Sequence, residues 1–247
     1  MPRLQRSARV LAVALTVGLS LTACGDKDQK DSGADHHTKP PTAKMTQDDF
    51  GERMFRAMMK SGSARVHFEA GSRVHKTIGD GEVKYGKKMA MRMAMTPPTG
   101  ATATSHDVIV IGDTVYVPIE DKYMSMSMDS MKGQGLPDMS SALDPHVQAK
   151  AFDSAVTAFK QAGPSESIDG VKATPYAITI DPKKAPDVFG ATFTEPLSFV
   201  FFVGPDDLPR KMVYKDPNGE FVAKYSHWGR PVNIEAPPAD KIMKGMG

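Results

Sequence analysis

Apolar residues recur at every second position in several short segments of this chain, which are separated by glycine, proline and other turn residues. A period of two is typical of strands that bury one face, and the separators predict tight turns between successive antiparallel strands. We expect roughly ten strands, within residues 66–95, 108–128, 174–180, 197–203, 212–226 and 232–234. In the first of these segments, turns are expected at Gly71, Gly79, Gly81 and Gly86.

Local signals refine this predicted sheet at three places. Gly112-Asp113 has glycine first, as a type II′ hairpin turn prefers, and Asn218-Gly219 is a strong type I′ signal. The run LSFVFFV at 197–203 is apolar at nearly every position. We therefore expect that strand to be covered on both faces.

Two segments have the 3.6-residue periodicity of amphipathic helices. The first is expected over residues 46–61, where Thr46 is a suitable N-cap. The second is expected to begin at Asp144-Pro145 and to end at Gly163-Pro164. Their apolar stripes comprise Phe50, Met54 and Met58 in the first helix and Phe152, Val156 and Phe159 in the second.

Together these elements predict an α+β fold built on one strongly curved antiparallel sheet. A meander of strands with one apolar face must cover that face, and two helices are too few to cover both sides of a large sheet. We expect a half-barrel whose concave face is covered by the two main helices, which leaves an apolar cleft.

The N-terminal 23 residues have the features of a secretory signal: three arginines, no acidic residue, and an apolar run too short to span a bilayer. This run ends in Leu21-Thr22-Ala23-Cys24, which resembles the lipobox of bacterial lipoproteins. By that resemblance, Cys24 is diacylated and becomes the first residue of the mature protein. The alternative is ordinary signal cleavage, which would leave Cys24 as the kind of free thiol that exported proteins tend to avoid.

The chain is thus predicted to have three parts: a signal peptide over 1–23, a disordered tether over 24–45 and one domain over 46–242. The tether is rich in charge, glycine and proline, and it cannot bury enough apolar surface to fold. Because Cys24 is the only cysteine, no internal disulfide can form, and the core alone must hold the domain together. A domain of roughly 200 residues can bury enough surface for that.

Charge and motifs argue against two classes of function. Three of the 31 Lys and Arg residues lie in the signal segment, so 28 basic residues face 29 acidic ones in the mature chain. Such a balance lacks the basic surface that binds nucleic acid. The sequence has no G-x-S-x-G, H-E-x-x-H, S-x-x-K or P-loop motif, and its carboxylates cluster in turns such as Asp206-Asp207. We expect no nucleic-acid partner, no enzymatic activity and no cofactor.

Two predicted strands carry methionine at alternate positions, so each places its thioethers on one face. The residues are Met89, Met91, Met93 and Met95 in the first strand and Met124, Met126 and Met128 in the second. Three interpretations are open: an ordinary core, an adaptable wall for acyl chains, or a Cu(I) site made of soft thioether ligands. Copper is disfavoured because alternate residues on a strand lie about 7 Å apart, unless neighbouring strands converge.

Trp228 is the only tryptophan, and two roles are open for it. It could lie at the mouth of the cleft or at the membrane interface, or it could plug the end of the sheet. The adjacent His227 could titrate near physiological pH, but the sequence shows no carboxylate partner for it.

Three segments of the C-terminal half resemble the LppX/LprG-type lipoproteins of actinobacteria. They are SIDGVKATPYAITID (167–181), FFVGPDDLPRKMVY (201–214) and YSHWGRPVNIEAPPADKI (225–242). The resemblance implies a fold like that of the LolA/LolB lipoprotein carriers, a curved half-barrel with helices across its mouth and a cavity for acyl chains. It also implies a lipid-binding role, whereas no residue here can be matched to a lipid head-group site.

These inferences combine into one expectation. The protein is expected to be a monomeric lipoprotein, tethered by Cys24 to the extracytoplasmic side of the cell membrane, that binds an acyl-chain lipid or glycolipid and could carry it within the cell envelope. The seven methionines are the candidate cavity residues, and the helix next to the tether is the part expected to move. The alternatives are an extracytoplasmic copper-binding module that uses the same methionines and a structural or signalling lipoprotein with an empty cavity.

Overall fold

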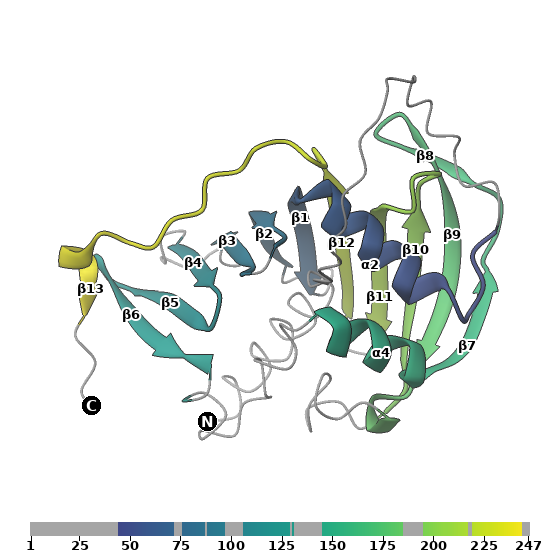
Figure 1. Cartoon of the computed structure of the whole chain (residues 1–247), viewed down its shortest axis with the longest axis horizontal. Helices are drawn as coiled ribbons and strands as arrows, with labels where there is room; N and C mark the ends of the chain where they lie inside the picture. The colour runs from purple at the N-terminus through teal and green to yellow at the C-terminus, as the bar shows by residue number, and fades with distance from the viewer. Residues whose placement is uncertain are drawn as a thin grey trace, which may run out of the picture.

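The computed structural model describes residues 44–71, 76–86, 88–96, 106–128, 130, 145–184, 195–216 and 219–243. The predicted signal peptide, Cys24 and all of the predicted tether except its last two residues therefore lie outside the described residues. No helix in the described part of the chain is both long and apolar enough to span a bilayer. The described strands form one sheet, and helices α2 and α4 lie against it (Figure 1).

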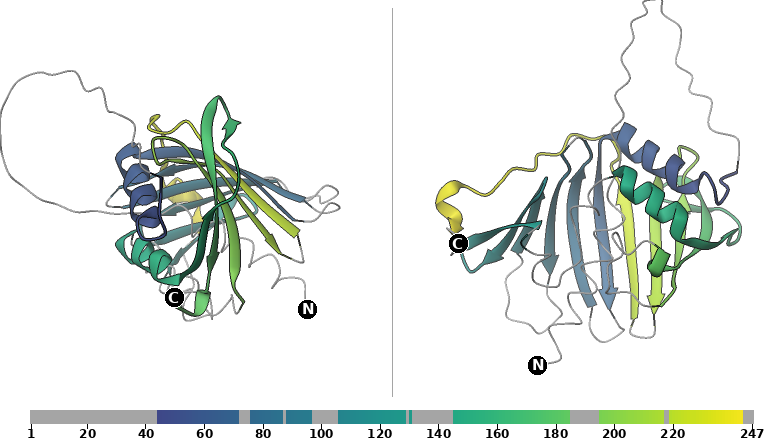
Figure 2. Two further views of the ribbon diagram at one scale, coloured as in Figure 1. Left: turned by 90° about the vertical axis from the view of Figure 1, so that its right-hand side faces the viewer. Right: turned by 60° about the horizontal axis from the view of Figure 1, so that its bottom comes forward.

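The predicted α+β fold with a strongly curved antiparallel sheet is confirmed. The helices are α2 (Phe50–Ser61) and α4 (Pro145–Ala155). The strands are β1 (Ser63–Gly71), β2 (Lys76–Lys84), β3 (Ala90–Thr96), β4 (His106–Ile111), β5 (Thr114–Ile119), β6 (Lys122–Ser127), β7 (Val156–Gln161), β8 (Glu166–Ile168), β9 (Val171–Ile180), β10 (Leu197–Val203), β11 (Pro209–Asp216), β12 (Gly219–Ser226) and β13 (Ile242–Met243). Their order is β13-β6-β5-β4-β3-β2-β1-β12-β11-β10-β9-β7, with β8 paired to β9. The sheet curves without closing (Figure 2).

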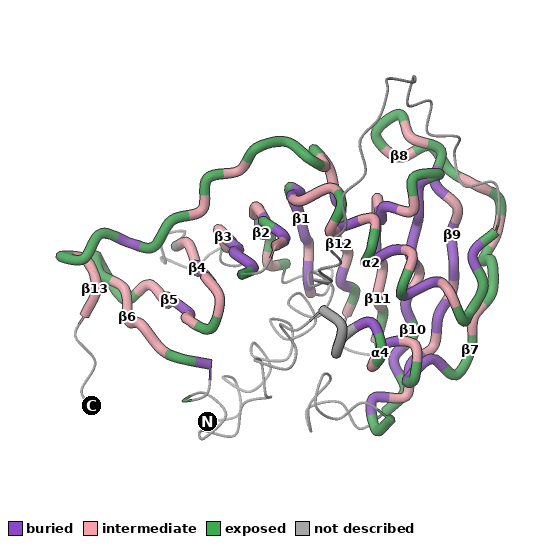
Figure 3. Tube along the Cα trace, viewed as in Figure 1, coloured by how far each residue is buried: buried purple, intermediate pink, exposed green. Residues whose placement is uncertain are grey.

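The strand register puts apolar side chains on the concave face, in rows that cross the strands. One such row consists of Val108, Met93, Gly81, Val66 and Tyr225, on β4, β3, β2, β1 and β12. The convex face instead carries ion pairs between neighbouring strands, among them Arg65–Glu82 and Lys76–Glu69. Buried and exposed positions consequently alternate along the strands (Figure 3).

Helices α2 and α4 cover the part of the concave face that lies around β12, β11 and β10 (Figures 1 and 2). Phe50 of α2 is the centre of this contact. Its ring lies 5.4 to 5.9 Å, centroid to centroid, from the rings of Phe152, Phe159, Tyr176 and Phe201. Aromatic pairs at this spacing are stabilising beyond their buried area, so this cluster fixes both helices to the sheet.

The second predicted helix is too long. Helix α4 ends at Ala155, and Val156 starts β7, so Val156 and Phe159 lie in a strand instead of a helical stripe. The β-branched and aromatic residues of this segment favour a strand, and β7 pairs with β9 at the edge of the sheet. Phe159 still reaches the cluster around Phe50, which explains why its apolar character suggested a helix facing the core.

Two further strand predictions are wrong. Gly79 and Gly81 do not form turns, because β2 runs through both and pairs with β1 and β3. The strand predicted over 232–234 is absent, and the chain forms β13 instead, which pairs in parallel with β6. Pro231 and the Pro237-Pro238 pair lack the backbone donors that a strand needs in this segment.

Other local predictions have mixed outcomes. The hairpin at Gly112-Asp113 is confirmed, since Ile111 pairs with Thr114 across these two residues and Gly112 has a φ of 54°. Strand β10, expected to be covered on both faces, is covered fully only on its concave face. On the convex face Ser198 is exposed, whereas the Phe202 ring lies under the Lys211 ammonium at 4.4 Å.

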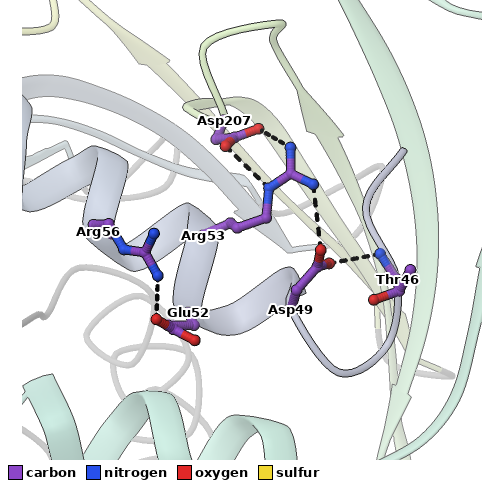
Figure 4. Close-up of polar contacts among 6 residues, drawn as sticks. All are labelled: Thr46, Asp49, Glu52, Arg53, Arg56 and Asp207. Carbon is purple, nitrogen blue, oxygen red and sulfur yellow. Dashed lines mark hydrogen bonds and ion pairs between the residues drawn. The ribbon is translucent and has the colours of Figure 1, made fainter. Parts of the chain in front are cut away.

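Arg53 ties α2 to the turn between β10 and β11. Its Nε and Nη2 donate to the two carboxylate oxygens of Asp207 at 3.1 and 2.8 Å, and its Nη1 donates to Asp49 at 3.3 Å (Figure 4). Asp49 is the N-cap residue of α2, so this helix begins three residues later than the predicted cap at Thr46. Asp207, which the sequence suggested to be only a turn residue, thus also positions a helix.

We predict that Arg53→Ala lowers the free energy of unfolding by about 1–3 kcal/mol, because it removes charge-assisted hydrogen bonds from a mostly buried carboxylate. The matched control is Arg56→Ala in the same helix, whose partner Glu52 is exposed (Figure 4). Loss of an exposed pair should cost about 0.5 kcal/mol or less. Urea denaturation measures both changes, and equal effects would contradict the anchoring role of Arg53.

Asp153 of α4 contacts the first turn of α2. A Cβ atom at position 51 would lie 2.3 Å from Asp153 Oδ1, so glycine allows the close approach of the two helices. Burial raises the pKa of Asp153 to about 6; the backbone N–H of Gly51 opposes this shift, and the nearby charges of Glu52, Asp48 and Asp49 add to it. The ionised carboxylate is therefore disfavoured at this helix contact.

A raised carboxyl pKa makes stability depend on pH in a defined direction. The folded state keeps the Asp153 proton up to a pH of about 6, whereas the unfolded state loses it near the ordinary value of 3.8. The contribution of the Asp153 proton to the free energy of unfolding is therefore fully present below pH 3.8 and is lost as the pH rises through about 6. We predict that Asp153→Asn raises the melting temperature at pH 7.5 and that this gain shrinks as the pH falls to 4. A gain that is independent of pH would contradict the shifted pKa.

Candidate ligand-binding cavity

A cavity lies on the concave face where β12, β1, β2 and β3 run side by side. Its wall consists of Val66, Phe68, Val83, Tyr85, Met89, Met91, Met93, Phe221, Ala223 and Tyr225. No charged side chain is among these residues, and the two tyrosine hydroxyls are the only polar side-chain groups. The volume is about 20 Å³, which is room for about one water molecule. Typical ligand pockets measure about 300–1,000 Å³, so a lipid chain requires the wall to rearrange.

Two glycines of β2 make room for side chains of the cavity wall. Gly79 is paired with Phe68, and Gly81 with Val66, so both occupy concave-face positions of the sheet. A Cβ atom at Gly79 would lie 2.1 Å from the Phe68 ring, and one at Gly81 would lie 2.8 Å from Met93 Sδ. The cavity wall therefore depends on the absence of side chains at these two positions. Sequence reasoning missed this role because a glycine within an alternating segment was interpreted as a turn.

The structure separates the seven candidate methionines into two groups. Met89, Met91 and Met93 are buried and line the cavity. The others do not line it: Met95 is half-buried against the core, Met124 and Met126 are half-buried on β6, and Met128 is buried in the core. The register shows that the methionine face of β3 is the concave one, which the sequence could not decide.

Strand order also bears on the copper interpretation. Met91 on β3 and Met126 on β6 lie in one row, but Val110 on β4 and Val115 on β5 stand between them. Three strand spacings correspond to about 14 Å. The two methionine strands are therefore not neighbours, and they lack the convergence that a shared Cu(I) site needs. Among the described residues, no group of three or more His, Cys, Asp or Glu side chains is placed to hold a metal.

Trp228 contacts the two tyrosines of the cavity wall. Its ring stacks on Tyr85 and on Tyr225, with centroids 6.0 Å apart in both pairs, and its Nε1 donates to the Pro209 carbonyl at 3.1 Å. This arrangement fits the interpretation of Trp228 as a plug at the end of the sheet. His227 beside it is exposed, and its Nδ1 contacts Ser226 Oγ at 2.9 Å.

The two tyrosines of the wall are fully desolvated. Burial raises the pKa of Tyr85 well above its usual range, and the proximity of Tyr225 adds to this shift. Burial also raises the pKa of Tyr225. Both hydroxyls therefore keep their protons at any physiological pH. Tyr85 Oη is buried and has no hydrogen-bond partner in the described part of the chain.

Two solved structures have the same fold as this chain. LprF from Mycobacterium bovis is 16% identical, and the match covers 77% of this chain and 96% of LprF, with a TM-score of 0.54. The lipoprotein LppX from Mycobacterium tuberculosis is 17% identical, and the match covers 76% of this chain and 98% of LppX, with a TM-score of 0.56. No protein-family model and no curated protein matches the sequence. The predicted resemblance is thus confirmed at the level of the fold.

We predict that Gly81→Ala lowers the free energy of unfolding by about 1–3 kcal/mol, because the added methyl group overpacks the cavity wall. The new Cβ would lie 2.6 Å from the backbone oxygen of Arg92, which has little freedom to move. Gly86→Ala is the matched control, since its nearest neighbour would be 3.9 Å away. That change should alter stability by about 0.5 kcal/mol or less. Similar losses in both variants, measured by chemical denaturation, would contradict the close packing at Gly81.

Proposed function

We propose that this protein is a lipoprotein of the extracytoplasmic side of the cell membrane that binds an acyl-chain lipid or glycolipid. The observation that carries the proposal is the cavity, whose wall is apolar and without a charged side chain. Moving a lipid chain from water into such an apolar cavity is favourable by about 0.8 kcal/mol of free energy for each buried methylene group. The shared fold with the lipoprotein LppX supports the same conclusion.

Entry of a lipid chain requires the cavity to widen. Rearrangement of the methionine side chains in the wall would allow this. Met89, Met91 and Met93 form one side of the wall. Methionine has three rotatable bonds and adapts to many packings, so these side chains can rearrange around a guest at small cost. We therefore propose that the lipid chain is bound by these three methionines together with the apolar residues of β1 and β12 in the cavity wall.

Helix α2, the part that the sequence suggested would move, is held at both ends. Arg53 binds Asp207 near its start, and Phe50 lies within the aromatic cluster. At its end, the carbonyl of Gly62 accepts a hydrogen bond from the backbone N–H of Tyr85 at 2.9 Å. These contacts favour widening by side-chain motion on β3 over a hinge motion of α2.

Anchoring completes the proposal. Acylated Cys24 and a tether over 24–45 would hold the cavity near the leaflet from which the ligand comes. The tether allows a reach of roughly 25 Å if it behaves as a random coil. Within that distance the protein would extract and shield a lipid at the membrane surface.

The test compares two matched substitutions on the concave face. Met91→Arg puts a cation into the cavity wall, whereas Met126→Arg makes the same change on β6, where the half-buried side chain can extend to solvent. We predict that Met91→Arg reduces the lipid that co-purifies with the protein at least tenfold and that Met126→Arg leaves it nearly unchanged. Lipid extraction and native mass spectrometry measure the bound amount.

Because Met91→Arg can also disturb folding, Ala223→Val serves as a second variant that narrows the cavity without adding a charge. Circular dichroism verifies the fold of each variant. Loss of lipid in both Met91→Arg and Met126→Arg would extend the site over the whole concave face. Undiminished lipid in well-folded Met91→Arg and Ala223→Val would place the ligand elsewhere. If the wild-type protein binds no lipid, the proposal fails and the alternative of a structural or signalling lipoprotein is favoured.

A further inference from the structure

Tyr85 places an unpaired hydrogen-bond donor in a wall whose only other polar side-chain group is the hydroxyl of Tyr225. The residue is 5% exposed, its ring packs against Trp228, and Oη has no partner among the described residues. A buried polar group without a partner destabilises the folded state, because its lost contacts with water are not replaced. Phenylalanine would fill the same space without this cost. The hydroxyl is therefore a candidate for a contact that forms only when a ligand is bound.

The chemistry of the wall limits what that partner can be. Burial and the nearby Tyr225 keep the Tyr85 hydroxyl protonated, so it can donate a hydrogen bond. None of the ten residues that line the cavity is Lys, Arg or His. A carboxylate or phosphate would enter without a counter-charge, at a large desolvation cost. The partner must be a neutral acceptor that is carried by an apolar chain.

A trapped water molecule satisfies Tyr85 poorly. A buried water usually makes about three hydrogen bonds, whereas the side chains of this wall offer only the hydroxyls of Tyr85 and Tyr225. An ester carbonyl needs only one donor to be satisfied, and the hydrocarbon on either side of it suits the methionine and aromatic wall.

We propose that the Tyr85 hydroxyl donates a hydrogen bond to an ester carbonyl of the bound lipid, so that the cavity selects neutral acyl esters over free fatty acids and plain hydrocarbons. This inference rests on the proposed lipid-binding function. It adds the class of linkage that the cavity recognises and the residue that recognises it.

Three probes of similar chain length test this selectivity: methyl palmitate, heptadecane and palmitate at pH 8. Purified protein is equilibrated with each probe in detergent micelles, and the bound amount is measured by mass spectrometry after extraction. We expect wild-type protein to prefer methyl palmitate over both others. Tyr85→Phe should weaken methyl palmitate binding about 2- to 10-fold, as for one hydrogen bond, and leave heptadecane binding equal or stronger.

An infrared readout separates a direct contact from a structural effect. With methyl palmitate labelled with ¹³C at the carbonyl, the carbonyl stretch should lie at lower frequency in wild-type protein than in Tyr85→Phe. Tyr176→Phe is the matched control, because Tyr176 is buried in the aromatic cluster and does not line the cavity. It should change neither the selectivity nor the carbonyl frequency. Thermal unfolding should show that Tyr85→Phe is at least as stable as wild type.

The outcomes distinguish the two proposals. If wild-type protein loads none of the probes, the lipid-binding function fails, and this inference fails with it. If wild-type protein loads methyl palmitate and heptadecane equally and Tyr85→Phe changes neither, the cavity binds lipid but the Tyr85 assignment is wrong. If Tyr225→Phe abolishes the selectivity while Tyr85→Phe does not, the donor is the other tyrosine. An ordered water on Tyr85 Oη in lipid-loaded protein would also overturn the assignment.

Discussion

The apolar concave face of the sheet is the constraint on which the other features depend. Alternating residues on successive strands put a mostly apolar surface on one side of the sheet and ion pairs on the other, and the apolar side must be shielded from water. Helices α2 and α4 cover the part around β10 through the cluster centred on Phe50. Arg53 and Asp207 hold α2 in place over that surface. Where β12, β1, β2 and β3 meet, strand curvature and side-chain choice leave the small cavity.

The packing of the cavity wall depends on two glycines as well as on its apolar side chains. Gly79 and Gly81 leave two concave-face positions of β2 empty, and the Phe68 ring and the Met93 thioether occupy part of that space. Glycine usually weakens a strand interior, so its presence at two such positions has a packing reason. The adaptable methionine side chains of the same wall can fill the cavity when no ligand is bound and can rearrange around a ligand when one enters.

Tyr85 is a core residue that stability alone would not favour, because its buried hydroxyl has no hydrogen-bond partner among the described residues. Natural sequences tend to break local rules at functional positions, and a buried hydroxyl without a partner is such a break. Trp228 increases the cost by covering the ring and excluding water from it. The same desolvation makes any hydrogen bond to a ligand stronger and leaves no place for a charged group.

The sequence by itself determined most of the strands, the first helix, the hairpin at Gly112-Asp113 and the grouping of methionines on single faces, because these depend on periodicity and turn chemistry among nearby residues. Tertiary structure decided that helix α4 stops at Ala155, where pairing with β9 favours a strand, and that Gly79 and Gly81 lie inside β2. It also decided that the methionines of β3 and those of β6 lie apart, since strand order places β4 and β5 between the two strands. Strand pairing brings together segments that are far apart in the chain. Local residue patterns do not specify which distant strand a segment will pair with.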